Sequence, residues 1–525
     1  MSSGRVVVVG AGHNGLVAAV RLAKAGLRPL VLERRAAAGG MASEEEIHPG
    51  FRCPVVFSTM GPLLPALARE LRLEAHGFEL LAPKIRVFCP SPGGPPGAIF
   101  EDPAATAEAW KRSSPKDAER YPAFAESFRR IGRVLRPVLE MTPPSIDRPS
   151  PSEIWRLLGV GRGFRGLGKT DAYRLLRWVP MAVADLAAEW FENDLLRAAI
   201  AARGVFGAFA GPWSAGTCVG PLFQTALDGH AVAPGSFPRG GMGAFTGALV
   251  SAARAAGAEV RTGAEVRRIL VRGGRAAGIE LESGETIDAS AVVSNADPKT
   301  TYLKLVDPAE LDPDFLHKVR NFRAVGSMAK VNFALSALPA FSGAGAGHLD
   351  GRIHIGAGID ELERAYDSAK YGEISPRPSL DVSIPSVLDP SLAPTGAHVM
   401  SVTVQHAPYK LRSGDWNGRR EELGEIVEKT IEDFAPGFRN LVVARRVLSP
   451  ADIESELGAW GGQIFHGEPS LDQLFTMRPL LGWAKYGSPI PGLFLCGSGT
   501  HPGGGVNGLS GWNASREILK DLKTS

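Results

Sequence analysis

Residues 5–9 (RVVVV) run directly into Gly10-Ala11-Gly12-His13-Asn14-Gly15, and this stretch decides the fold of the chain. The apolar run predicts a buried strand, and LVAAVRLAKAGL after it has the pattern of a helix packed on that strand. A second apolar run, PLVLE, ends at the acid Glu33. Strand, G-x-G-x-x-G turn, helix and acid-terminated strand together predict a dinucleotide-binding βαβ unit.

The residues of this turn have separate expected roles. We expect Gly10 to permit the tight turn, Gly12 to let the backbone approach a pyrophosphate, and Gly15 to let the helix pack close to the strand. The helix N-terminus then offers free N–H groups and the positive end of its dipole to the phosphates. His13 is expected to act through its backbone, and Glu33 to accept hydrogen bonds from a ribose diol.

Composition limits the class of protein. The 525 residues are 44% hydrophobic and 22% charged, enough for a sizeable core in two or three domains. With 58 basic and 55 acidic residues the net charge is +3, which gives no reason to expect a nucleic-acid partner.

The first strand leaves no room for a signal peptide, and no apolar run is long enough to cross a membrane, so we expect a cytoplasmic protein. No redox disulfide or metal site is expected, because the four cysteines are scattered: Cys53, Cys89, Cys218 and Cys496.

Three further segments point to the same nucleotide site. A second glycine pair, Gly39-Gly40, follows Glu33 closely and precedes Met41. Residues 238–243 (PRGGMG) precede a helical run, and GAEVRRI at 263–269 predicts a strand. Near the C-terminus, the short strand GLFLC at 492–496 leads into a glycine-rich turn at 497–508 and a final helix. Such a turn again places backbone N–H groups at the start of a helix.

Taken together, these blocks resemble FAD-dependent oxidoreductases of the phytoene desaturase-like family. The resemblance is sharp in GAGHNGL (10–16), PRGGM (238–242), GGQIFHGEPSLDQLF (461–475) and CGSGTHPGGGVNGLSG (496–511). The pair Asn507-Gly508 stands where carotenoid desaturases often have Pro-Gly, which argues against a carotenoid substrate. The resemblance implies bound FAD, and we expect these residues to contact it: Gly10, Gly12, His13, Asn14, Gly15, Glu33, Arg34, Gly40, Met41, Gly241, Val266, Gly497, Ser498, Gly505, Val506 and Asn507.

The implied fold class is α/β. A Rossmann-like FAD-binding domain of the glutathione-reductase or amine-oxidase type is expected from residues 1–75, 238–300 and 475–525. A mixed α+β substrate-binding domain, formed by residues 76–237 and 301–474, would interrupt it. A second G-x-G-x-x-G with flanking strands is missing from the sequence, so electrons would leave the flavin to oxygen, a quinone or another acceptor.

The expected reaction is hydride transfer from an apolar or amphipathic substrate to the flavin, by a dehydrogenase or desaturase. His466 and His501 are the catalytic candidates, because imidazole titrates near neutral pH; His230 is a weaker one. Each is also open to a structural, hydrogen-bonded role, His230 most of all. Two alternatives stay open: a flavin amine or alcohol oxidase that releases hydrogen peroxide, and a non-catalytic flavoprotein that serves as an interaction module.

A basic and aromatic stretch lies at residues 155–178. Six basic residues and one acid alternate there with four aromatic side chains, a composition that suits an anionic membrane surface. The alternative is a solvated basic face of the substrate-binding domain. The same stretch matches G-x-x-x-x-G-K-[ST] at 163–170, but without the preceding buried strand that an ATP-binding loop needs. Oligomeric state is left open by the sequence.

Overall fold

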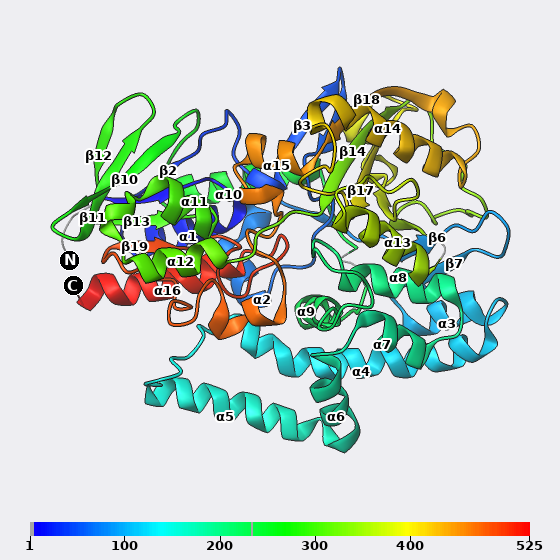
Figure 1. Ribbon diagram of the computed structural model, residues 1–525, viewed down its shortest axis with the longest axis horizontal. Helices are drawn as coiled ribbons and strands as arrows, with labels where there is room; N and C mark the ends of the chain where they lie inside the picture. The colour runs from blue at the N-terminus through cyan, green and yellow to red at the C-terminus, as the bar shows by residue number, and fades with distance from the viewer. Residues whose placement is uncertain (1–4, 233–234, 357, 525) are drawn as a thin grey trace.

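The computed structural model describes residues 5–232, 235–356 and 358–524. At one end of the molecule lies a parallel sheet with strand order β19-β13-β1-β2-β9. Its strands come from three distant parts of the chain: β1 (Val6–Val9), β2 (Pro29–Leu32), β9 (Glu259–Arg261), β13 (Ala291–Ser294) and β19 (Leu493–Leu495). The predicted α/β class is therefore confirmed. The two chain ends lie close together beside this sheet, at the left of Figure 1.

Both faces of this sheet are buried, which explains why its strands are continuously apolar. Val6 and Val8 belong to a core shared with α1 (His13–Lys24), α10 (Gly241–Ala255) and α16 (Leu509–Thr524). The alternate residues Val7 and Val9 face a second core on the other side. That core includes an antiparallel sheet of β10 (Val266–Arg272), β11 (Arg275–Leu281) and β12 (Thr286–Asp288).

The segment after residue 300 continues the second core of this sheet. Tyr302 and Phe315 are buried there, and their rings meet edge to face at 4.9 Å. The segment comprises α11 (Pro298–Thr300), a π-helical turn (Thr301–Leu305) and α12 (Pro313–Asn321). Residues 302–322, which the division of the sequence assigned to the substrate-binding part, thus pack with the nucleotide-binding sheet.

A second, seven-stranded sheet fills the opposite end of the molecule, with order β18-β14-β17-β16-β15-β6-β7. Neighbouring strands are antiparallel except β15 and β6. Its helix α14 (Trp416–Glu432) buries Trp416 and Val427 in the core under the sheet. The strands are β6 (Ile85–Cys89), β7 (Gly97–Phe100), β14 (Met328–Leu335), β15 (Arg352–Ile355), β16 (Leu380–Ser383), β17 (His398–Gln405) and β18 (Val442–Leu448).

Helices form a third layer below this sheet (Figure 1). The apolar run 183–202 forms parts of two helices, because Asn193 caps the second one by accepting from the N–H groups of Leu195 and Leu196. Among these helices, α5 and α6 stand apart below α4 in Figure 1. The layer contains α3 (Pro103–Lys111), α4 (Pro115–Glu140), α5 (Pro151–Gly166), α6 (Gly168–Trp178), α7 (Val183–Trp190), α8 (Asp194–Gly204) and α9 (Val219–Asp228).

The remaining elements connect these layers. The hairpin of β3 (Glu44–His48) and β4 (Phe51–Pro54) reaches the second sheet, where Asn332 donates to the Pro54 carbonyl at 2.8 Å. The other elements are α2 (Pro65–Leu71), β5 (Leu80–Leu81), β8 (Phe237–Pro238), α13 (Ile359–Lys370) and α15 (Pro450–Leu457). A search of the described residues found no helix with the length and apolar character that crossing a membrane requires.

Candidate functional site

A cavity of about 750 Å³ opens at the carboxyl ends of β1 and β2. Ligands of open α/β sheets bind at this edge. Ten of the sixteen expected cofactor-binding residues line it: Gly10, Gly12, His13, Asn14, Glu33, Arg34, Gly40, Met41, Val266 and Ser498. The structure therefore gathers most of the expected set around one cavity, although the set spans nearly the whole chain.

The glycine turn has the geometry that its spacing predicts. Gly10 has a φ of +94°, which favours glycine. A side chain at Gly15 would collide with the Gly10 carbonyl, so the third glycine allows the helix to approach the strand. A Cβ at Gly12 would lie 2.7 Å from the Asn295 amide nitrogen, at the cavity wall. The turn is thus shaped for close approach of a ligand to the backbone.

Glu33 has a structural role that the sequence did not indicate. One carboxylate oxygen accepts from the Ala11 N–H at 2.9 Å, and the other accepts from the Arg35 N–H at 3.0 Å. Each carboxylate oxygen can accept two hydrogen bonds. Glu33 can therefore fix the glycine turn and still accept from a ribose diol in the cavity.

Six of the expected cofactor residues lie away from this cavity wall. Gly15 and Gly497 serve close packing, since a Cβ at Gly497 would lie 2.6 Å from the Asn295 carbonyl. Gly241 begins α10 beside the Glu44 carboxylate. The other three, Gly505, Val506 and Asn507, line a second cavity instead.

Several cavity residues were missed by the sequence reasoning. Asn295 directly follows β13, and its place after a parallel strand could have indicated it. Glu454 and Ser455 come from α15, where Ser455 accepts from Arg34 at 3.0 Å through its carbonyl. Their sequence surroundings carry no comparable signal. Further residues missed are Arg35, Phe57, Thr300, Lys304 and Tyr409, whereas Gly39 of the predicted glycine pair lines the cavity.

Two histidines supply a test of whether a polar cofactor fits this cavity. Nε2 of His13 and Nδ1 of His466 are buried, line the cavity and have no hydrogen-bond partner among the described residues. Burial, and then the nearby His466, lower the pKa of His13 to about 4, and burial lowers the pKa of His466. Buried imidazole nitrogens without a hydrogen-bond partner are unfavourable, and a bound polar group could form the missing hydrogen bonds. The residues present fit FAD.

The structure separates the two catalytic candidates. His466 lines the nucleotide cavity and holds a left-handed backbone conformation, with φ of +59°. His501 lies outside both cavity walls; its Nε2 contacts the Val138 carbonyl at 2.9 Å, and burial lowers its pKa to about 3. His230 is also buried away from the cavities, with Nε2 at 3.3 Å from the Phe100 carbonyl. Of these three histidines, only His466 lines the nucleotide cavity.

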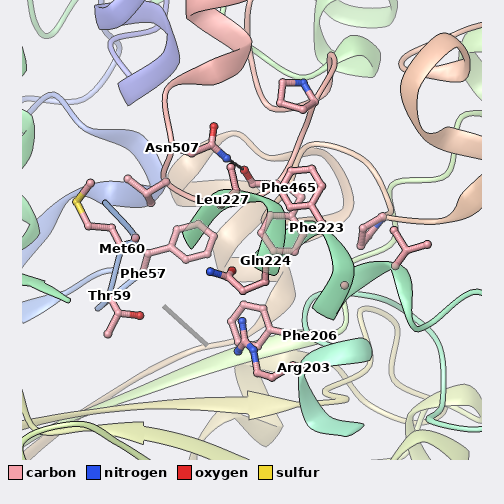
Figure 2. Close-up of a pocket in the computed structure, with 18 of the residues that line it drawn as sticks. Phe57, Thr59, Met60, Arg203, Phe206, Phe223, Gln224, Leu227, Phe465 and Asn507 are labelled. Atoms are coloured by element: carbon pink, nitrogen blue, oxygen red, sulfur yellow. Dashed lines mark hydrogen bonds between the residues drawn. The ribbon is translucent and has the colours of Figure 1, made fainter. Parts of the chain in front are cut away.

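A second cavity, of about 140 Å³, is drawn in Figure 2. Phe57 lines both. Its ring stacks on Phe465 at 5.9 Å, and Phe465 also meets Phe206 at 6.3 Å. One wall is the glycine-rich turn at 504–507; the others are mainly apolar and include Met60, Phe206, Phe223, Leu227 and Phe465. An apolar chamber therefore opens beside the cofactor cavity.

Lys330 lies near Phe57, the residue that lines both cavities, and was missed by the sequence reasoning. It stands on β14, borders a small void also lined by Phe57 and Phe206, and donates to the Thr403 hydroxyl at 3.0 Å. Burial, and then the charge of Arg352, lower the pKa of Lys330 to about 7. The ammonium ion is therefore disfavoured in the folded chain.

Replacing Lys330 with methionine should stabilise the protein at neutral and lower pH. The unfolded lysine titrates at 10.5 and the folded one at about 7, so the unfolded state binds more protons between these values. The free energy of unfolding of the wild type should therefore rise with pH over that window. Below pH 7 the wild type should bear the full cost of burying the charged lysine, about 3–5 kcal/mol. Denaturant unfolding at pH 6 and pH 9 measures this. A stability difference independent of pH, or the same change in the exposed Lys111→Met control, would contradict it.

The fold and the cavity define a class: a flavoprotein with a Rossmann-type cofactor domain. The chain belongs to the flavin-containing amine oxidoreductase family, whose model matches residues 15–519. Its cofactor is FAD, and it is an oxidoreductase.

Relatives confirm the resemblance. "Pyridine nucleotide-disulfide oxidoreductase domain-containing protein 2" of Rattus norvegicus is 35% identical, over 98% of this chain and 93% of the rat protein. The lycopene-forming phytoene desaturase of Pantoea ananas is 27% identical, over 96% of both chains. An oxidoreductase from Methanosarcina mazei shares the fold with a TM-score of 0.62 at 18% identity, over 98% of this chain and 100% of the other. All four cysteines of the chain described here are buried and free.

Proposed function

We propose that the protein is a FAD-dependent dehydrogenase or desaturase acting on an apolar or amphipathic small molecule. The observation that carries this proposal is the apolar chamber that shares Phe57 with the cofactor cavity. FAD held at the nucleotide cavity would supply the hydride acceptor, and the substrate would lose a hydride and a proton as its new double bond forms. The likeness to a phytoene desaturase, at 27% identity, supports oxidation of this kind.

The chain's own residues would hold and shield the reactants. Phe57, Phe223 and Phe465 would exclude water from the substrate body. The turn at 504–507 forms another wall, and Gly505 in it contacts His13 of the cofactor cavity. Of the two catalytic candidates, His466 is the one that lines the cofactor cavity, and burial lowers its pKa, which keeps the imidazole neutral as a proton acceptor must be.

The proposal is tested by the colour and reduction of the purified protein. It should be yellow, and lipid extracts added without oxygen should bleach the flavin absorption. An amine or alcohol oxidase would instead release hydrogen peroxide with a polar substrate. A protein that takes up no FAD on reconstitution would overturn the proposal.

We further propose that the protein is cytoplasmic and touches an anionic membrane surface through α5 and α6. None of the sixteen residues of α5 is buried. Trp155 is 68% exposed, and Tyr173 and Leu176 are exposed to a similar degree. Exposed apolar side chains beside basic ones match a negatively charged lipid surface. The exposed apolar residues are Ile154, Trp155, Leu157, Leu158, Tyr173 and Leu176.

Replacing Trp155 and Leu158 with serine should release the protein from vesicles. We expect co-sedimentation with vesicles of phosphatidylcholine and phosphatidylserine to fall about fivefold or more, because these two side chains supply much of the exposed apolar area. High salt should weaken binding of the wild type. Replacing the exposed Tyr371, far along the chain, with serine is the matched control. If variant and wild type sediment equally, α5 does not form the membrane contact.

A further inference from the structure

Two buried arginines stand at the end of the apolar chamber away from the flavin turn. Figure 2 shows Arg203 and Phe206 on the opposite side of the pocket from Asn507. Arg203 lies in the last turn of α8 and Arg352 begins β15, and both line the cavity with Asp381 of β16. The side chain of Arg203 is 11% exposed and that of Arg352 is 8% exposed. Arg478 also lines the cavity, but its guanidinium donates to the Phe465 and Ser498 carbonyls. The Arg203 end is thus where the chamber offers guanidinium groups to a polar head of a bound molecule.

The charges at this end do not balance. Arg352 donates to one Asp381 oxygen at 2.8 Å, and Nη1 of Arg203 lies 3.3 Å from the other. Among the residues that line this end of the chamber, two guanidinium ions face one carboxylate, an excess of one positive charge. Asp228 faces Arg203 from outside the lining and pairs with Arg86 at 2.9 Å, and Arg86 pairs in addition with the exposed Glu101. The chamber itself therefore offers more guanidinium than carboxylate to a bound molecule.

Unused hydrogen-bond donors point the same way. Nε of Arg203 is buried and has no partner among the described residues. The two guanidinium groups hold ten N–H donors, whereas the Asp381 carboxylate has about four acceptor positions. The guanidinium of Arg203 also lies over the Phe206 ring at 4.2 Å, which keeps its plane beside the cavity. A planar carboxylate matches such donors in geometry as well as in charge.

We propose that the substrate carries one carboxylate, bound by Arg203 and Arg352, with its apolar body between the aromatic side chains and its oxidised carbon at the 504–507 turn. This inference rests on the proposed function and narrows its substrate class to amphipathic monoacids. A phosphate dianion would exceed the single uncompensated charge. A hydrocarbon would leave that charge unpaired, and an alkylammonium ion would be repelled.

The test is calorimetric titration of the FAD-loaded protein with octanoate, octanol, octyl phosphate and octylamine. Octanoate should bind about tenfold tighter than octanol, and octyl phosphate should be weaker than octanoate. Arg203→Gln should weaken octanoate about tenfold and change octanol by less than about twofold, whereas Asp381→Asn should tighten octanoate. Arg272→Gln, at an exposed site on β10, is the control and should change neither.

Two results would overturn the inference: equal binding of octanoate and octanol, or loss of both ligands together in Arg203→Gln. The Asp381→Asn variant keeps the test valid if Arg203→Gln does not fold, because octanoate must then bind more tightly, not less. Failure of the proposed function is visible separately. If the protein binds FAD but shows no preference for octanoate, this inference alone is contradicted. If the protein takes up no FAD, the proposed function is contradicted.

Discussion

Gly12→Val should yield a folded, colourless protein. Gly12 caps α1 with φ of −70° and ψ of 165°, a conformation open to valine, so the backbone need not change. The new side chain would instead occupy the cavity wall, where the first Cβ already comes 2.7 Å from the Asn295 amide nitrogen. That amide can rotate, whereas a cofactor pressed against the turn cannot. We expect FAD affinity to fall about 100-fold or more, roughly 2.7 kcal/mol.

The measurement is FAD titration of the unloaded protein, followed by thermal unfolding with and without FAD. A ligand that binds the native state raises its stability by an amount that depends on concentration over Kd, so the variant should lose this gain. Gly247→Val is the matched control, because it lies in α10 with no atom within 4 Å of an added Cβ. A yellow Gly12→Val protein with normal FAD content would disprove the role of the turn.

The nucleotide-binding part could be predicted from sequence because its constraints are local. Gly10, Gly12 and Gly15 each occupy a position in one turn where the backbone leaves no room for, or does not favour, a side chain. The apolar strands on either side indicate a sheet that is buried on both faces. The C-terminal glycine-rich turn is predictable for the same reason, and in the structure Asn14 donates to the Ser498 hydroxyl at 3.0 Å beside the cavity. Such motifs can be recognised because the neighbouring sequence shows the strand and the helix that they connect.

The substrate chamber could not be predicted, because its residues are brought together only by tertiary packing. Arg203 lies on a helix, Arg352 and Lys330 lie on different strands, and Phe57 follows the β3–β4 hairpin. None of these stands in a recognisable spacing. Reasoning from chemical type also misled: His501 lies within the most glycine-rich turn of the chain, yet its ring points to the Val138 carbonyl and not to a cavity.

Arg478→Met should destabilise the protein strongly and release FAD. Arg478 is 1% exposed, and its partners among the described residues are backbone carbonyls: Ser498 at 2.7 Å, Phe465 at 2.9 Å, and Gly467, Glu468 and Gln473 at 3.3–3.4 Å. It thereby ties the His466 loop to the C-terminal flavin turn. Burial lowers its pKa to about 10, still well above neutral, so the side chain remains charged.

Methionine would leave these buried carbonyls without donors, at an expected cost of about 3–5 kcal/mol in the free energy of unfolding. Denaturant unfolding and flavin content measure both effects. Arg478→Lys should recover part of the stability, because an ammonium ion offers three donors without the planar fork. Arg272→Gln, on the exposed hairpin, should change neither quantity. If Arg478→Met stays within about 1 kcal/mol of the wild type and retains FAD, the two loops are held by other contacts, and the position of His466 at the cofactor does not depend on this arginine.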